Sequence, residues 1–238
     1  MRSRRGLVLA DVERPRRPLW SRPGSIRSFA GVKRTSTQSL LFEESRPTIW
    51  TIGHSTRSFD AFVALLLEYR IQLLADVRHY PVSQRVPWTT KGNLARGLQE
   101  RGVAYEHFED LGGYRKAAVP SLNEGWRNAG FRGYADRMSS SEFRAALDHL
   151  LHLACDTRTA IMCAEALPWR CHRSLLSDAL LIRGVRVIHI LGPGKSQEHH
   201  LTPFAKVDGD RITYPAAGKR LKPRDVASRK GDDPRGAD

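Results

Sequence analysis

The sequence predicts an α/β protein: a single three-layer domain with a mainly parallel sheet of about five strands. Short apolar or β-branched runs alternate with segments whose apolar residues recur at helical spacing. The helical segments are roughly 10–15 residues long, which suits the right-handed crossovers of βαβ units. With 238 residues, 40% of them hydrophobic, the chain is long enough to bury one good core.

The expected elements follow in order. Residues 48–52 are β-branched and apolar, Gly53 closes this strand, and Ser58 is the N-cap of the first helix. The other expected strands are 73–77, a short one from Gly102-Val103 to Tyr105, 159–163 and 185–191, and the other expected helices are 91–101, 141–155 and 172–183. Residues 114–140 are rich in Gly, Asn and Arg and lack periodicity. We expect an excursion there, pinned to the core by Trp126, Phe131 and Tyr134.

The net charge of +14 belongs mostly to the two ends of the chain. Residues 1–40 contain ten Lys or Arg and two acidic residues, and residues 215–238 contain seven against four. Residues 41–214 contain 22 against 19, so this part is nearly balanced. We therefore predict disordered basic tails at 1–45 and 215–238 around an α/β domain at 46–214.

Three explanations compete for the N-terminal tail: a solvated segment without a role, an arm that tethers nucleic acid through phosphate contacts, or an organellar transit peptide. The chain has no apolar run long enough for a membrane span and no pattern of a secretory signal. Its three cysteines cannot form a closed disulfide framework. These features favour the cytoplasm.

Unlike polar groups follow several expected strands where each strand ends. His54 and Ser55 follow the first strand, Asp76 and Arg78 the second, and Cys163 and Glu165 the fourth. Because the carboxyl ends of parallel strands share one edge of a sheet, these groups should line a cleft there.

The segment 159–173 is the richest in chemistry, because it joins a buried strand to a helix that opens with Cys171-His172-Arg173. A thiol at Cys163 that faces the helix N-terminus and Arg173 would have a lowered pKa. A cation in the first turn of a helix needs an anionic partner. For Arg173 that partner is Glu165 or Asp76, or else a bound phosphate or carboxylate.

Each candidate also has a structural interpretation. Asp76 would pair with Arg78, His54 would be a turn residue, His189 a satisfied core histidine, and Cys163 a small buried hydrophobe. A metal site is a further option, although Cys-x₇-Cys-His is not a usual zinc spacing. Its ligands would be Cys163, Glu165, Cys171 and His172.

Several separated motifs resemble the bacterial and archaeal domain-of-unknown-function family 488, over roughly residues 48–192. They are Thr51-Ile-Gly-His-Ser55, Asp76-Val-Arg78 with Pro81 and Ser83, Tyr105, Leu111-Gly-Gly113, Met162-Cys-x-Glu165 and Cys171-His-Arg173. The resemblance implies a small soluble α/β domain with no settled activity, and the cofactor stays unknown. The two tails lie outside it.

The leading hypothesis is an enzyme acting on an anionic substrate related to a nucleotide or nucleic acid. Its expected catalytic residues are Asp76, Glu165, Cys163 and His54, and its expected substrate-binding residues are Ser55, Arg78, Ser83, Cys171, His172 and Arg173. Cys163 lacks the Cys-x₅-Arg loop of a thiol phosphatase. The alternatives are a non-catalytic module that binds nucleic acid through its basic tails, and a Cys/His protein that binds metal or responds to redox state.

Overall fold

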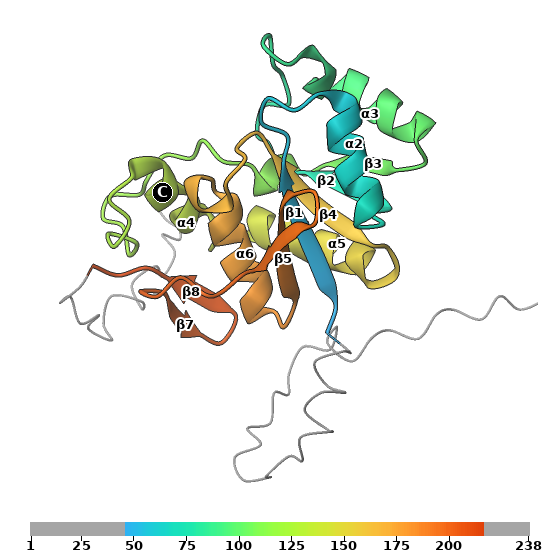
Figure 1. Cartoon of the computed structure of the whole chain (residues 1–238). Helices are drawn as coiled ribbons and strands as arrows, with labels where there is room; N and C mark the ends of the chain where they lie inside the picture. Colours follow the sequence, from blue (N-terminus) through green and yellow to red (C-terminus); the bar gives the residue numbers. More distant parts are fainter. Residues whose placement is uncertain (1–45, 217–238) are drawn as a thin grey trace, which may run out of the picture. The chain divides into compact units, whose positions relative to one another are not determined.

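The computed structural model describes residues 46–216 (Figure 1). The predicted tails lie outside this part of the chain, except for Pro215 and Ala216. The strands are β1 (Thr48–Gly53), β2 (Leu73–Asp76), β3 (Ala104–His107), β4 (Thr159–Cys163), β5 (Arg186–Gly192), β6 (Lys195–Glu198), β7 (Lys206–Asp208) and β8 (Arg211–Thr213). Six of them form one sheet in the order β3-β2-β4-β1-β5-β6, and β7 and β8 form a hairpin. Only β6 runs antiparallel in the six-stranded sheet, so the predicted mainly parallel α/β class is confirmed.

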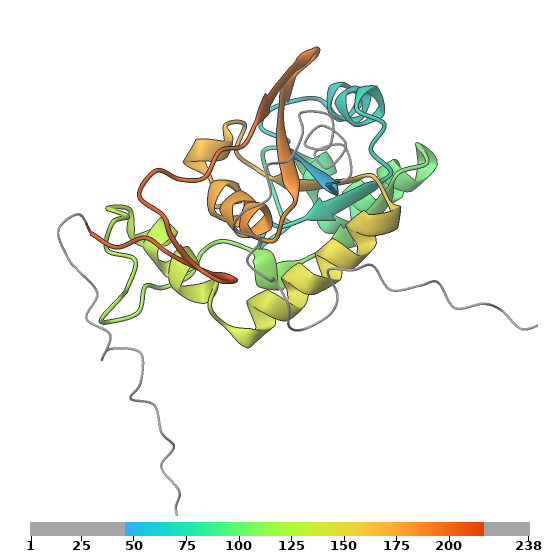
Figure 2. The same cartoon turned by 90° about the horizontal axis from the view of Figure 1, so that it is seen from below.

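Helices cover both faces of the sheet (Figures 1 and 2). They are α2 (Phe59–Glu68), α3 (Lys91–Glu100), α4 (Ala129–Arg137), α5 (Ser141–Asp156) and α6 (Arg173–Ile182), with short 3₁₀ turns η2 (Pro87–Thr89), η3 (Glu109–Leu111) and η4 (Pro168–Arg170). One core cluster lies between the sheet and α2 with α3, and the other between the sheet and α4, α5 and α6. The three layers follow from this arrangement. Ser58 caps α2 as expected, because its Oγ accepts from the N–H of Ala61.

The central strands are buried on both faces, and their side chains alternate between the two clusters. In β1, Ile49 faces the cluster under α5 and α6, and Trp50 faces the cluster under α2 and α3. In β4, Ile161 and Cys163 face the α5 and α6 side, and Met162 faces the other. Cys163 is therefore aimed at the layer that contains α6.

Three elements were absent from the sequence prediction: α4, the edge strand β6 and the β7-β8 hairpin. The excursion at 114–140 contains α4. Its aromatic residues do pin it to the core, as expected: Tyr134 is fully buried, and Trp126 and Phe131 pack against the same cluster. The Oη of Tyr134 donates to the carbonyl of Leu111 over 2.9 Å, which ties α4 to η3.

No helix in residues 46–216 combines the length and the apolar character that a membrane crossing requires.

Candidate functional site at the carboxyl edge of the sheet

The carboxyl ends of three strands lie side by side, because β4 lies between β2 and β1. Gly53 of β1 is in register with Cys163 of β4, and Asp76 of β2 is in register with Met162 of β4. The turns that carry the predicted site residues therefore leave the sheet from one short stretch of its edge.

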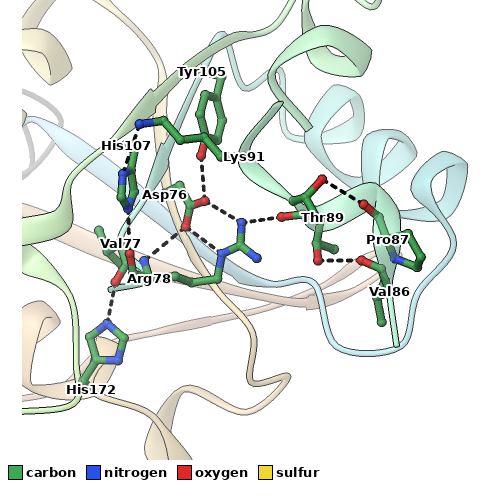
Figure 3. Close-up of polar contacts among 11 residues, drawn as sticks. Asp76, Val77, Arg78, Val86, Pro87, Thr89, Lys91, Tyr105, His107 and His172 are labelled. Carbon is green, nitrogen blue, oxygen red and sulfur yellow. Dashed lines mark hydrogen bonds and ion pairs between the residues drawn. The ribbon is translucent and has the colours of Figure 1, made fainter. Parts of the chain in front are cut away.

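Asp76 and Arg78 form a buried ion pair at this edge (Figure 3). Arg78 donates from Nε to Oδ1 of Asp76 over 2.8 Å and from Nη2 to Oδ2 over 2.6 Å. The backbone N–H of Arg78 and the Oη of Tyr105 also donate to this carboxylate. Burial and the charge of Asp76 raise the pKa of Tyr105, so its phenol stays a donor. Both oxygens of Asp76 are occupied, which favours the structural interpretation of this residue.

The loop between β2 and α3 is fastened to the same pair. Nη2 of Arg78 donates to the carbonyl of Thr89 over 2.7 Å. Ser83 stabilises the loop from within, since its Oγ accepts from the N–H of Val86 over 3.0 Å. The Nη1 group of Arg78 makes no hydrogen bond within residues 46–216, so it is the part of this guanidinium that remains available.

His54 and Ser55 form a tight turn after β1. Ser55 has a positive φ of 50°, and His54 donates from Nδ1 to the carbonyl of Ser55 over 2.9 Å. This tautomer leaves Nε2 of His54 as an acceptor. Burial lowers the pKa of His54, and the positive charges of Arg78 and Arg173 add to that effect. His54 is therefore a neutral imidazole close to two cations.

Arg173 begins α6 and is 1% exposed. Its Nη2 donates to the backbone carbonyls of Glu165 and Ala166, and its Nε donates to Sγ of Cys163 over 3.0 Å. The expectation that a carboxylate of Glu165 or Asp76 is its partner is wrong. The turn after β4 presents backbone carbonyls to Arg173 instead, while the side chain of Glu165 is exposed.

A chain of buried hydrogen bonds connects Arg173 to a distant carboxylate. Nη1 of Arg173 donates to Oγ1 of Thr51 over 3.3 Å, and Thr51 bonds to Nδ1 of His189 over 2.8 Å. Nε2 of His189 lies 3.1 Å from Nδ1 of His199, and Nε2 of His199 lies 2.9 Å from Oδ1 of Asp178. We call these five residues the buried relay.

The donor and acceptor roles at the two ends of the buried relay are fixed. A guanidinium can only donate and a carboxylate can only accept, so Thr51 accepts from Arg173 at one end, and Nε2 of His199 donates to Asp178 at the other. Burial, with the charges of His199 and Arg173, lowers the pKa of His189 to about 3, which keeps it neutral in this role. Arg173 thus has a carboxylate partner at a distance.

The interpretation of His189 as a satisfied core histidine agrees with its two buried hydrogen bonds in the relay. The roles of Asp178 and His199 were not predicted from the sequence. Asp178, which is fully buried, also accepts from Tyr214 and from the N–H of Thr202. Asp178 could have been noticed in the sequence, because it is an acidic residue within the apolar periodicity of α6.

Cys163 and Cys171 are buried, free thiols whose Sγ atoms lie 2.6 Å apart. Burial and the hydrogen bond to Cys171 raise the pKa of Cys163 well above the ordinary value, so the prediction of a lowered pKa for Cys163 is wrong. Burial also opposes ionisation of Cys171, but the bond from Cys163 and the charge of Arg173 outweigh it and lower its pKa to about 7. Of the two thiols, Cys171 therefore has the lower pKa.

The side chain of His172 is held by a hydrogen bond to the backbone directly after β2. Its Nε2 donates to the carbonyl of Val77 over 2.9 Å, which leaves Nδ1 as an acceptor 3.5 Å from Sγ of Cys171. Burial lowers the pKa of His172. Both ring nitrogens of His172 are thus engaged within the protein, and Sγ of Cys171 lies against Cys163, His172 and Arg173.

Arg57 is a further cation at the carboxyl edge of the sheet, and it was not among the site residues predicted from the sequence. It donates from Nη1 to the carbonyl of Gly53 over 2.5 Å and from Nη2 to the carbonyl of Leu191 over 3.0 Å, at the ends of β1 and β5. No carboxylate of residues 46–216 forms an ion pair with it. Burial and the charge of Arg173 lower the pKa of Arg57. In the sequence, the only local indication that Arg57 lies at this edge is its position between the end of a strand and the Ser58 cap.

Three large aromatic side chains are exposed on the loops that leave the carboxyl ends of the strands. Tyr80 follows β2, Tyr114 follows β3 and η3, and Trp169 follows β4. They are 63%, 86% and 53% exposed, respectively. The rings of Tyr80 and Tyr114 lie 6.2 Å apart.

Of the four residues proposed as metal ligands, Cys163, Cys171 and His172 lie close together, whereas the side chain of Glu165 is exposed. Within the described range, no three His, Cys, Asp or Glu side chains are arranged to hold a metal ion. His172 turns to Val77, and Glu165 contacts Arg173 only through its backbone.

The profile of the family described as "Domain of unknown function DUF488" matches residues 58–180, just over half of the chain. The chain belongs to the DUF488 family. The matched span contains the Asp76-Arg78 pair and the whole segment from Cys163 to Arg173, while the turn at His54 and Ser55 precedes it. No curated protein and no solved structure shows a significant match.

Proposed function

We propose that this DUF488 protein is an enzyme that acts on an anionic substrate, a nucleotide or a segment of nucleic acid, bound at the carboxyl edge of the sheet. The observation that carries the proposal is Arg57. Its guanidinium is held by two backbone carbonyls, near Arg173 and without a carboxylate partner in the described part of the chain. A cation without a carboxylate partner favours an anion, and a guanidinium binds phosphate oxygens in pairs.

The aromatic side chains around the edge favour a ligand with a base over a simple inorganic anion. Tyr80, Tyr114 and Trp169 are exposed on loops that leave the same edge of the sheet. Bases stack on such rings with little dependence on sequence, while the phosphates pair with arginines.

His54 and Glu165 are the best candidates for proton transfer. The free Nε2 acceptor of His54 suits a general base, and the exposed carboxylate of Glu165 is not engaged in an ion pair within residues 46–216. Nη1 of Arg78 and the hydroxyls of Ser55 and Ser83 would contact the anion. Asp76 and Arg173 would position these groups from behind.

The test is a titration of the full chain with a 5′-mononucleotide and with single-stranded DNA and RNA oligonucleotides, with the products separated by chromatography. Arg57→Gln is expected to weaken binding about tenfold, the value of one charge-assisted hydrogen bond. Arg183→Gln is the matched control, because Arg183 ends α6 at the opposite edge and pairs with Asp148. Equal affinities of both variants and the unchanged chain would contradict the proposed site.

Binding without any product would favour the alternative of a nucleic-acid-binding module. In that case the basic tails dominate, and deletion of residues 1–45, which removes ten Lys and Arg, should reduce the salt dependence of binding steeply.

A further inference from the structure

The two buried thiols carry an inference that goes beyond substrate binding. We propose that Cys163 and Cys171 form a peroxide-reactive dithiol that closes to a disulfide, with Cys171 as the attacking thiol and Cys163 as the resolving thiol. The two residues stand at either end of the turn that connects β4 to α6.

Proximity is the first argument. The Sγ atoms lie 2.6 Å apart, and a disulfide bond is about 2.0 Å long, so closure requires a shift of only about half an ångström. Cys155 provides the contrast within the same chain. It lies on α5 and donates to the carbonyl of Leu151, one turn back in its own helix.

Activation of Cys171 is the second argument. Its Sγ lies at the N-terminus of α6, where it accepts from the N–H of Arg173 over 3.5 Å. Nδ1 of His172 is an unprotonated acceptor at the same sulfur, held in that tautomer by the carbonyl of Val77. A thiol, a base and a group that orients the base are the parts of an activated nucleophile.

The third argument is the use of a buried charge. The side chain of Arg173 is 1% exposed, and its Nε–H donates to Sγ of Cys163. If Cys163 and Cys171 were only small core residues, the acceptor of this buried cation would be a neutral thiol. The carboxylate of Asp178 is four hydrogen bonds away from Arg173, whereas a thiolate shared by the two sulfurs would place a negative charge in direct contact with this buried cation. Arg173 therefore points to a dithiol that holds one negative charge.

The reaction balances with hydrogen peroxide as the oxidant. The Cys171 thiolate attacks one oxygen, so that an S–O bond forms, the O–O bond breaks and the departing hydroxide leaves as water after protonation. The Cys163 sulfur then attacks the Cys171 sulfenic acid. The S–S bond forms, the S–O bond breaks, and the second hydroxide takes up the Cys163 proton. Two thiols lose two electrons in total, and one peroxide becomes two waters.

The experiment treats the full chain with hydrogen peroxide and counts free thiols, then locates the cross-link by peptide mapping. We expect two of the three thiols to disappear, a mass lower by two hydrogens, and a Cys163–Cys171 peptide, with Cys155 still free and full recovery under dithiothreitol. The rate of thiol loss should rise with pH around a midpoint of about 7.

Two matched variants separate the roles of the sulfurs. Cys155→Ser should react like the unchanged chain. Cys163→Ser should leave a sulfenic acid on Cys171 that a dimedone probe captures. The proposal is overturned if peroxide leaves all three thiols free, or if Cys171 is oxidised without a cross-link to Cys163. Thiol counting and peptide mapping of the unchanged chain are sufficient to decide between these outcomes, even if a variant fails to fold.

Discussion

At the scale of single residues, burial and hydrogen-bond partners separate the side chains that hold the edge together from those that can act on a ligand. Asp76 and Arg173 are fully engaged with protein partners. Glu165 is exposed, and Arg57 is bonded only to carbonyls. Removing a residue of the first kind should therefore affect folding strongly, whereas removing one of the second kind should affect function more than folding.

Asp76→Ala and Glu165→Gln test this distinction. Loss of the Asp76 carboxylate leaves the buried guanidinium of Arg78 without its partner, which should lower the free energy of unfolding by about 3–5 kcal/mol. Glu165→Gln should change it by less than about 0.5 kcal/mol, as is usual for a surface position. Urea denaturation measures both values. A stable Asp76→Ala protein would instead return Asp76 to the list of catalytic candidates.

At the scale of elements, the site depends on how closely the turn after β4 approaches the end of β1. A Cβ at Gly53 would lie 1.8 Å from the backbone oxygen of Glu165, which is the atom that accepts from Arg173. Gly53 therefore permits the contact that places two carbonyls around the guanidinium.

Gly53→Ala should displace this turn and destabilise the protein by about 1–3 kcal/mol, the usual cost of overpacking. Gly92→Ala is the matched control. A Cβ at Gly92 meets nothing within 4 Å, and alanine favours the helix α3, so this change should stabilise by up to about 1 kcal/mol. Thermal unfolding measures the two shifts, and shifts of the same sign would contradict the account.

At the scale of the whole molecule, the buried relay joins β1, β5, α6 and the segment after β6 through one series of hydrogen bonds. The relay needs a neutral His189, whose pKa is lowered from 6.5 to about 3. The unfolded chain binds a proton at this histidine below pH 6.5, while the folded chain does not. Stability is therefore fully present above pH 6.5 and is lost as the pH falls toward 3.

We expect the free energy of unfolding to fall between pH 7 and pH 5, with a contribution of at most about 1.4 kcal/mol per pH unit from His189. His189→Gln keeps an acceptor for Thr51 and a donor for His199, but it cannot titrate. Denaturation series at several pH values should give a shallower slope for this variant. Identical slopes would show that His189 is not the titrating group.

Much of the fold was predictable from local patterns. Buried strands and amphipathic helices recur along the chain, and because parallel strands share one carboxyl edge, the sequence also indicated where His54, Arg78 and Cys163 would gather. Residues 114–140 were harder, since α4 has few apolar residues and its position depends on Tyr134 packing against distant parts of the chain.

The chain's own pattern thus settled the α/β class, the family and the edge that bears the polar residues. Only the folded arrangement assigned partners to those residues: backbone carbonyls for Arg173, Cys163 for Cys171, and Asp178 at the far end of the relay. The physical reason is that periodicity reports which face of an element is buried. Hydrogen bonds between residues more than a hundred positions apart, such as Thr51 and His189, depend on strand order, which leaves no local trace.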